Sequence, residues 1–117
     1  FDIPSRLLEI YHITHYIQSL PRDIPVVLMG DFNSLSPADA AAHGRDKVLT
    51  HLLTKEKLRV KFLTPELDAI DYSVHKHLLA SRLVDLATIG TLNQNTVPTQ
   101  IHRDEGMQAA PMRLDYM

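Results

Sequence analysis

The sequence predicts a mixed α/β (α+β) unit, because a helical and a strand-like hydrophobic pattern follow one another along the chain. From Arg6 to Leu20, apolar residues recur every three or four positions, which is the spacing of one face of an amphipathic helix. Shortly afterwards, Ile24 to Met29 is an aliphatic run with little polar alternation, which is typical of a strand buried on both faces. Because Pro21 stands between the two patterns, the helix is expected to end there.

Two short helices are expected after this strand. Ser36 can cap the first of them, Pro37 suits its first turn, and Gly44 marks its end. Asp46 can then cap a second helix that runs through Leu53. The chain is therefore predicted to be largely helical from the cap to about residue 53.

A second strand is expected from Leu58 to Phe62, because apolar and basic side chains alternate there with a two-residue period. The basic residues of this region form a row: Lys55, Lys57, Arg59 and Lys61. The row can be interpreted as a rim that holds a phosphate backbone, or as a charged edge strand protected against unwanted pairing. Since no aromatic residues are interleaved on the same face, the edge-strand interpretation is favoured.

The remaining elements are less regular. Thr64 opens a helical stretch that runs towards Leu83, with a break near Ile70. Further strands are expected at residues 83–89, 96–101 and 112–117. Neither a repeat nor a linker interrupts the chain, so the sequence indicates a single domain or part of one.

Composition places the chain among ordinary globular proteins. Its 117 residues suffice for one compact domain, and 44% of them are hydrophobic and 22% charged. The absence of cysteine excludes a disulfide framework, a thiolate metal cluster and a cysteine nucleophile. No apolar run has the length of a membrane span and no signal pattern opens the chain, so we expect a soluble protein. The sequence assigns neither its cellular compartment nor its oligomeric state. The net charge of −2 does not indicate nucleic acid as a partner, although it leaves that partner open.

The most informative segment places an acid and an amide just past the carboxyl end of the first predicted strand. Ligands commonly bind at that position in sheet proteins. Asp31 can act as a base or orient a water molecule, and Asn33 can donate hydrogen bonds beside it, as in-line attack of water on phosphorus requires. On spacing alone, an Asx-type turn formed by the same two residues is the favoured interpretation.

A family resemblance favours the chemical interpretation instead. The sequence GDFNS at residues 30–34 resembles the signature loop of the endonuclease/exonuclease/phosphatase family. This family of metal-dependent phosphoester hydrolases includes deoxyribonucleases, abasic-site endonucleases, sphingomyelinases and inositol polyphosphate phosphatases. The sequence RLDYM at residues 113–117 is similar to a late strand of the family, and LVD at 83–85 and TVPT at 96–99 are looser matches in the correct order.

The resemblance implies a role for each matching residue. Asp31 corresponds to the aspartate that handles a proton of the attacking water or the leaving oxygen, and Asn33 to the asparagine that positions the nucleophile and phosphate. Asp115 corresponds to the aspartate that orients and stabilises the catalytic histidine. His102 is a further candidate, for substrate binding, because it follows Thr99 and precedes the strand with Asp115.

The resemblance also implies a fold, a cofactor and a domain boundary. The fold is about half of a four-layer α-β-β-α sandwich, the cofactor is Mg²⁺ or Mn²⁺, and the substrate is a phosphate ester. The family carries its metal-binding glutamate on earlier strands and its histidine in a later Ser-Asp-His motif. We therefore expect residues 1–117 to be the C-terminal part of one such domain, lacking the N-terminal strands and the final Ser-Asp-His segment. The principal metal ligand is expected outside the chain, and the chain is expected to be inactive alone.

Two other interpretations stay open. The chain can be a noncatalytic binding domain that retains the phosphoesterase scaffold. Local metal binding is a second alternative, because His12 and His15 are three residues apart and Asp71 and His75 four apart. Such spacings are common by chance, so solvated histidines and a surface pair are favoured.

The two best motifs together make a geometric prediction. If the chain has a family-like site, the side chains of Asp31 and Asn33 should converge with that of Asp115 on one cleft, despite their separation in sequence. The cleft should be partly open, with exposed apolar surface nearby.

Overall fold

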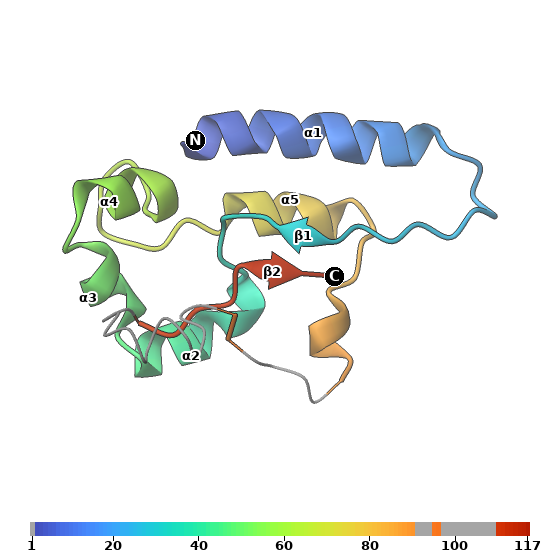
Figure 1. Ribbon diagram of the computed structural model, residues 1–117. Coiled ribbons are helices and arrows are strands. Elements are labelled where there is room, and N and C mark those ends of the chain that lie inside the picture. The colour runs from blue at the N-terminus through green and yellow to red at the C-terminus, as the bar shows by residue number, and fades with distance from the viewer. Residues whose placement is uncertain (1, 91–94, 97–109) are drawn as a thin grey trace.

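The computed structural model describes residues 2–90, 95–96 and 110–117 (Figure 1). These residues form five α-helices, two short 3₁₀-helices and one two-stranded sheet. In chain order they are α1 (Ile3–Ser19), β1 (Gly30–Asp31), η1 (Pro37–Asp39), α2 (Ala40–Arg45), α3 (Val48–Leu52), α4 (Glu56–Phe62), α5 (Ser73–Ala80), η2 (Leu86–Thr88) and β2 (Asp115–Tyr116). The predicted α+β class is confirmed. One ladder is present in this part of the chain, rather than the two stacked sheets of a four-layer sandwich.

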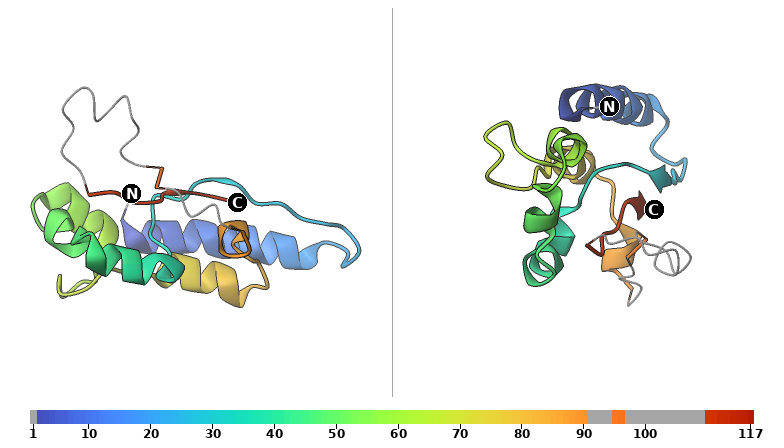
Figure 2. Two further views of the ribbon diagram at one scale, coloured as in Figure 1. Left: turned by 90° about the horizontal axis from the view of Figure 1, so that it is seen from below. Right: turned by 60° about the vertical axis from the view of Figure 1, so that its left-hand side comes forward.

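Helix α1 begins three residues before the predicted start at Arg6, because Asp2 caps it. The Asp2 carboxylate accepts a hydrogen bond from the backbone N–H of Ser5 at 2.9 Å, and Pro4 occupies the first turn. The helix ends at Ser19, before Pro21, as predicted. Both views in Figure 2 show α1 running beside α5. Neither α1 nor any other helix that the structure describes is long and apolar enough to cross a membrane.

The core consists of two clusters. The larger one joins α3 and α4 to the segment before β2 through Leu35, Val48, Leu52, Phe62, Leu63, Met112 and Leu114. The smaller one joins α1 to α5 through Ile10, Val74 and Leu78, with Leu28 and Phe32 packed against it. Leu28 before β1 and Phe32 after it therefore lie against α1 and α5, while Leu35, further along the chain, enters the larger cluster.

The helical region after β1 is confirmed with different boundaries. Ser36 caps as predicted, with its Oγ accepting from the backbone N–H of Ala38 at 3.2 Å, but the first turn is the 3₁₀-helix η1. Asp46 does not cap α3. Its carboxylate instead receives two hydrogen bonds from Arg45, and Lys47, in the left-handed region at φ 52°, precedes the helix.

The predicted buried strand from Ile24 to Met29 is wrong. The ladder contains only Gly30–Asp31, paired antiparallel with Asp115–Tyr116. Val27 and Met29 are each 66% exposed, whereas Val26 and Leu28 are half-buried, so exposure alternates as it does along a strand. No strand in the described part of the chain pairs with this segment, so it does not extend the ladder.

The predicted strand from Leu58 to Phe62 is also wrong, because these residues form helix α4. Leu58 and Phe62 are four residues apart, so a helix directs both towards the larger cluster. Glu, Lys, Leu and Arg all have good helix propensity, and it outweighs the two-residue alternation. The basic row is therefore divided between helix faces, and Lys57 and Lys61 share one of them.

Three later predictions need similar correction. The helix expected from Thr64 to Leu83 is reduced to α5, because residues 64–71 form a loop closed by an isolated bridge between Leu63 and Ile70. The strand expected at 83–89 contains η2, whose cap Asp85 accepts from the N–H of Ala87 at 3.1 Å. Of the 112–117 strand only β2 forms, and the 96–101 strand falls mostly outside the described residues.

Candidate functional site

The ladder brings the two predicted aspartates together. Asp31 and Asp115 are direct partners in the register, and the N–H of Phe32 donates to the carbonyl of Leu114 at 3.0 Å (Figure 1). Since hydrogen-bonded and non-hydrogen-bonded pairs alternate along an antiparallel ladder, the aspartates form a non-hydrogen-bonded pair, typically with Cα atoms about 4.5 Å apart. Their side chains leave the same face of the ladder, and both are exposed. The predicted proximity of Asp31 and Asp115 is confirmed, while their chemical role stays a prediction.

The loop after β1 contains the turn that spacing alone favoured. One carboxylate oxygen of Asp31, Oδ1, accepts from the backbone N–H of Asn33 at 2.7 Å, and Asn33 has a φ of 47°. This is an Asx turn, and asparagine tolerates the left-handed backbone that it requires. The turn fixes Asn33 beside Asp31 and uses one of the two carboxylate oxygens, so it is compatible with a chemical role for the other.

Lys61 joins the loop from α4. Its ammonium group donates to the side-chain oxygen Oδ1 of Asn33. Burial lowers the pKa of Lys61, with Asp31 opposing the shift and Arg6 adding to it. Sequence reasoning placed Lys61 on a charged strand and so missed this contact; a helical assignment of residues 56–62 would have set Lys57 and Lys61 on one face.

A cleft of about 880 Å³ lies between α1, β1 and α4. Its lining includes Arg6, Ile13, Met29, Asp31, Asn33 and Lys61. Asp115 is not among its lining residues, so the prediction that all three site residues converge on one cleft is wrong for this cleft, which contains only Asp31 and Asn33. Exposed apolar surface borders it as expected, since Met29 is 66% exposed and Val60 56%.

Behind the ladder, Arg113 forms a buried ion cluster with two acids. Its Nε donates to Asp39 at 3.1 Å, and its two terminal nitrogens donate to both oxygens of Asp85. Burial acts to lower the pKa of Arg113, but hydrogen bonds and charges of both acids outweigh it and raise the pKa. Burial likewise acts to raise the pKa of Asp85, and Arg113 reverses the shift. The cluster fixes the segment that leads into β2 and leaves none of its charges unpaired.

Tyr116 connects this cluster to the loop that follows β1. Its ring centroid lies 4.3 Å from the guanidinium carbon of Arg113, its hydroxyl donates to the carbonyl of Arg113 at 2.7 Å, and it accepts from the N–H of Ser36 at 3.1 Å. Burial raises the pKa of Tyr116. A phenol held in this way supports β2 and is not available as an acid.

His75 is buried rather than paired with Asp71 at the surface, so the surface-pair prediction is wrong. His75 is 4% exposed, its Nδ1 lies 3.0 Å from the hydroxyl of Ser34, and its ring centroid is 4.1 Å from that of Tyr116. Burial lowers its pKa to about 4, with Asp85 opposing the shift. Asp71 instead accepts from the N–H of Ser73 at 2.7 Å.

The other histidine predictions have mixed outcomes. His12 and His15 are exposed, as favoured. His102 lies outside the described residues. Within residues 2–90, 95–96 and 110–117, no three histidine or acidic side chains are grouped closely enough to hold a metal ion.

Comparisons with known proteins add no assignment: no family model, no curated protein and no solved structure matches this chain. The candidate site is therefore argued from its own geometry and from the motif resemblance.

Proposed function

We propose that this chain belongs to a domain that hydrolyses a phosphodiester or phosphomonoester with Mg²⁺ or Mn²⁺ as cofactor. The observation that carries the proposal is the direct opposition of Asp31 and Asp115 across the ladder. These two residues come from the two motifs that resemble the endonuclease/exonuclease/phosphatase family, and they lie far apart in sequence. Purely structural roles for both would give no reason to place two exposed carboxylates side by side, where they repel each other.

The roles follow from the positions of the donors and acceptors. Asp31 accepts a proton from the attacking water through the oxygen that the Asx turn leaves free, while Asn33 orients the phosphate. A new P–O bond forms to the water oxygen and the bond to the alcohol oxygen breaks. The leaving oxygen takes its proton from solvent water, and Asp31 returns the proton that it accepted to the hydroxide so formed. Asp115 positions the histidine that the family carries elsewhere.

The exposed carboxylates suit the proposed cation, because Mg²⁺ prefers oxygen ligands. When bound, the metal neutralises charge on the phosphate and on the leaving oxygen. The resemblance assigns its principal ligand to a glutamate outside residues 1–117, so the proposal concerns the complete domain.

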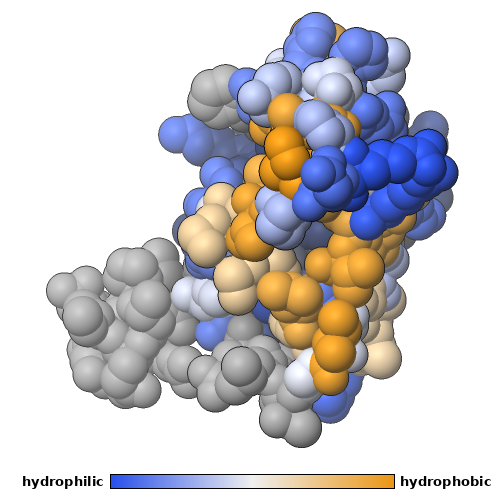
Figure 3. All heavy atoms as spheres, turned by 90° about the vertical axis from the view of Figure 1, so that its right-hand side faces the viewer, coloured by the Kyte–Doolittle hydropathy of each residue, from blue (hydrophilic) through white to orange (hydrophobic). Residues whose placement is uncertain are grey.

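The proposal extends to the four-layer sandwich. The exposed, alternating side chains of Val27 and Met29 support a neighbouring strand along that edge. Apolar side chains gather on the face of the molecule seen in Figure 3. Val27 also lines one groove together with Leu86 and Met117, and all three are exposed. A neighbouring strand and sheet would cover this surface.

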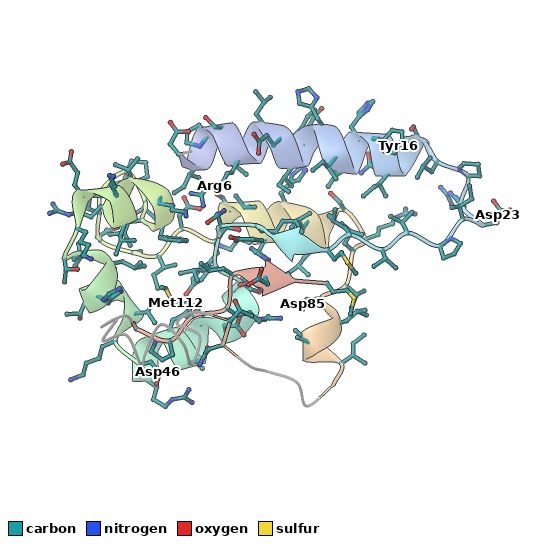
Figure 4. All side chains as sticks on the ribbon, in the orientation of Figure 1. Arg6, Tyr16, Asp23, Asp46, Asp85 and Met112 are labelled. Carbon is teal, nitrogen blue, oxygen red and sulfur yellow. The ribbon has the colours of Figure 1, made fainter. Side chains whose placement is uncertain are left out.

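The test is hydrolysis of bis(p-nitrophenyl) phosphate and p-nitrophenyl phosphate by the full-length protein, with added Mg²⁺ or Mn²⁺ and with chelator. Asp31→Asn should lower the rate by about 10²–10⁴-fold, the usual contribution of a positioned acid or base. Asp23→Asn is the matched control, because Asp23 is exposed at the tip beyond α1, far from the ladder (Figure 4). Activity that persists in chelator, or equal losses in the two variants, would contradict the proposal.

A noncatalytic binding domain is the second candidate. The observation that favours it is that one oxygen of Asp31 and the side-chain oxygen of Asn33 are already engaged within the fold. The natural sequence on both sides of this segment separates the candidates: an upstream glutamate and a downstream Ser-Asp-His favour the hydrolase, and their absence favours the binding domain.

A further inference from the structure

Arg6 is an unusual buried cation. It is only 5% exposed, yet it forms no ion pair with any acid in residues 2–90, 95–96 and 110–117. Its Nε and Nη2 donate to the backbone carbonyls of Asp2 and Lys61, and its Nη1 is buried without a hydrogen-bond partner. A buried guanidinium normally pairs with an anion, because desolvation of an uncompensated charge is costly.

A second cation stands beside it. Lys61 is half-buried, and both Lys61 and Arg6 lie over the ring of Phe62, at 5.3 and 5.8 Å from its centroid. Burial lowers the pKa of both side chains, and their mutual repulsion lowers that of Lys61 further. Both residues line the cleft that contains Asp31 and Asn33.

The acids nearby do not compensate these charges. Asp2 and Asp71 act on Arg6 only through longer-range attraction, and each is engaged in a local cap or turn through its own backbone neighbours. Asp31, Glu9 and Glu56 also line the cleft, and Asp31 attracts Lys61. All three acids are exposed at the rim, where water and salt screen them. The two least exposed charged side chains of the cleft, Arg6 and Lys61, are therefore both cations, whereas its exposed rim carries charges of both signs.

We propose that Arg6 and Lys61 bind the phosphate group of a phosphate monoester in this cleft. The Nη1 of Arg6, which has no partner, and the adjacent ammonium of Lys61 together supply donors and two positive charges, which match a phosphate dianion better than a singly charged carboxylate. Figure 4 shows Arg6 directed from α1 towards the space beside α4 and α5. As an assignment of substrate class this inference rests on the proposed hydrolase function, but the binding itself requires neither metal nor turnover.

The rest of the cleft indicates what the phosphate carries. Ile13 is about two helical turns from Arg6 along α1, and it lines the cleft together with Met29 and Val60. All three side chains are exposed, at 37%, 66% and 56%. An aryl or alkyl group attached to the phosphate would cover them, so the ligand is a phosphate monoester of an apolar alcohol.

The test is an NMR titration of the ¹⁵N-labelled 117-residue chain with phenyl phosphate at pH 7.5 in the presence of chelator. Inorganic phosphate and benzoate are the comparison ligands. Saturable shifts at Arg6, Asn33 and Lys61 are expected, with phenyl phosphate binding more tightly than either comparison ligand. Benzoate binding as tightly as phenyl phosphate would overturn the phosphate assignment, and equal affinity for inorganic phosphate would overturn the apolar one.

Variants separate the site from general charge. Lys61→Gln should weaken binding by about tenfold, the worth of one charge-assisted hydrogen bond. Lys55→Gln removes the same charge just before α4, outside the cleft, and should change the affinity less than twofold. Arg6→Lys keeps the charge but removes the Nη1 donor and should also weaken binding. Equal effects of the two lysine variants, or no saturable binding in the millimolar range, would overturn the inference.

Asp31→Asn distinguishes this inference from the proposed hydrolysis. It should lower turnover by the full-length protein about 10²–10⁴-fold. It should leave phosphate binding unchanged or tighter, because it removes a negative charge from the cleft. If phenyl phosphate binds but no phosphoester is hydrolysed, the hydrolase proposal fails and the phosphate site stands. If hydrolysis occurs and Lys61→Gln leaves both the binding of phenyl phosphate and KM unchanged, the phosphate site fails and the hydrolase proposal stands.

Discussion

Arg6 and Arg113 are equally buried, at 5% exposure, and differ in what surrounds them. Arg113 meets two carboxylates, and its pKa is raised because they compensate its charge within the fold. Arg6 meets backbone carbonyls, and burial lowers its pKa. The comparison teaches that burial of an arginine does not by itself identify its role. A compensated charge supports the fold, whereas an uncompensated one beside a cleft has the capacity to bind an anion.

The largest expected difference between the two regions is in stability. Arg113→Met should lower the free energy of unfolding by about 3–5 kcal/mol, because it leaves Asp39 and Asp85 buried without their partner. Arg6→Met should lower it by about 1 kcal/mol or less, since the lost hydrogen bonds are offset by removal of an unpaired buried charge. Urea unfolding of both variants measures the difference. Equal losses would show that Arg6 is as much a structural residue as Arg113.

Acid pH should perturb the compensated region through His75. Its pKa is about 4 in the folded chain against 6.5 for an ordinary histidine, so the unfolded chain binds this proton first as the pH falls. Stability is therefore lost between pH 6.5 and 4, by about 3 kcal/mol over the whole interval. Arg113 contributes to the low pKa, because a protonated imidazole would add a positive charge near the guanidinium.

Unfolding of His75→Phe as a function of pH tests this origin. The variant keeps an aromatic ring against Tyr116 but has no proton to bind, so its stability should depend less on pH between 6.5 and 4. His12→Phe is the matched control on the exposed side of α1 and should retain the wild-type pH dependence. A His75→Phe profile parallel to that of the wild type would assign the acid sensitivity to other groups.

The comparison also shows which features could be predicted from sequence. The end of α1 before Pro21, the cap at Ser36 and the proximity of Asp31 to Asp115 depend on local residue types or on recognisable motifs, and all three are present. The start of α1 was missed, because the cap at Asp2 was not recognised. The motif at 113–117 identified Arg113, but its pairing with Asp39 and Asp85 depends on tertiary contacts that no local pattern encodes.

Arg6 and Lys61 were misinterpreted for a related reason. Arg6 was treated only as the start of an amphipathic helix, although it shares a face with Ile10 and Thr14 at four-residue spacing. Lys61 was predicted to lie on a strand because apolar and basic residues alternate over five positions. An alternation this short also occurs within helices, and residues 56–62 form α4. In both cases a polar residue lies on the buried face of a helix, and that position is the signal that sequence analysis could have used.

The smallest expected effect separates the cleft from the ion cluster of Arg113 most directly. Phenyl phosphate at ten times its dissociation constant should stabilise the wild-type chain by about 1.4 kcal/mol, because it binds only the folded state. Arg113→Lys should lower the starting stability and keep this increment, since Arg113 lies behind the ladder and outside the cleft. Lys61→Gln should keep most of the starting stability and lose most of the increment, because its affinity falls. Thermal unfolding with and without ligand measures all three. An increment that survives in Lys61→Gln, or disappears in a still folded Arg113→Lys, would place phosphate binding elsewhere and end the distinction drawn between the cleft and the ion cluster.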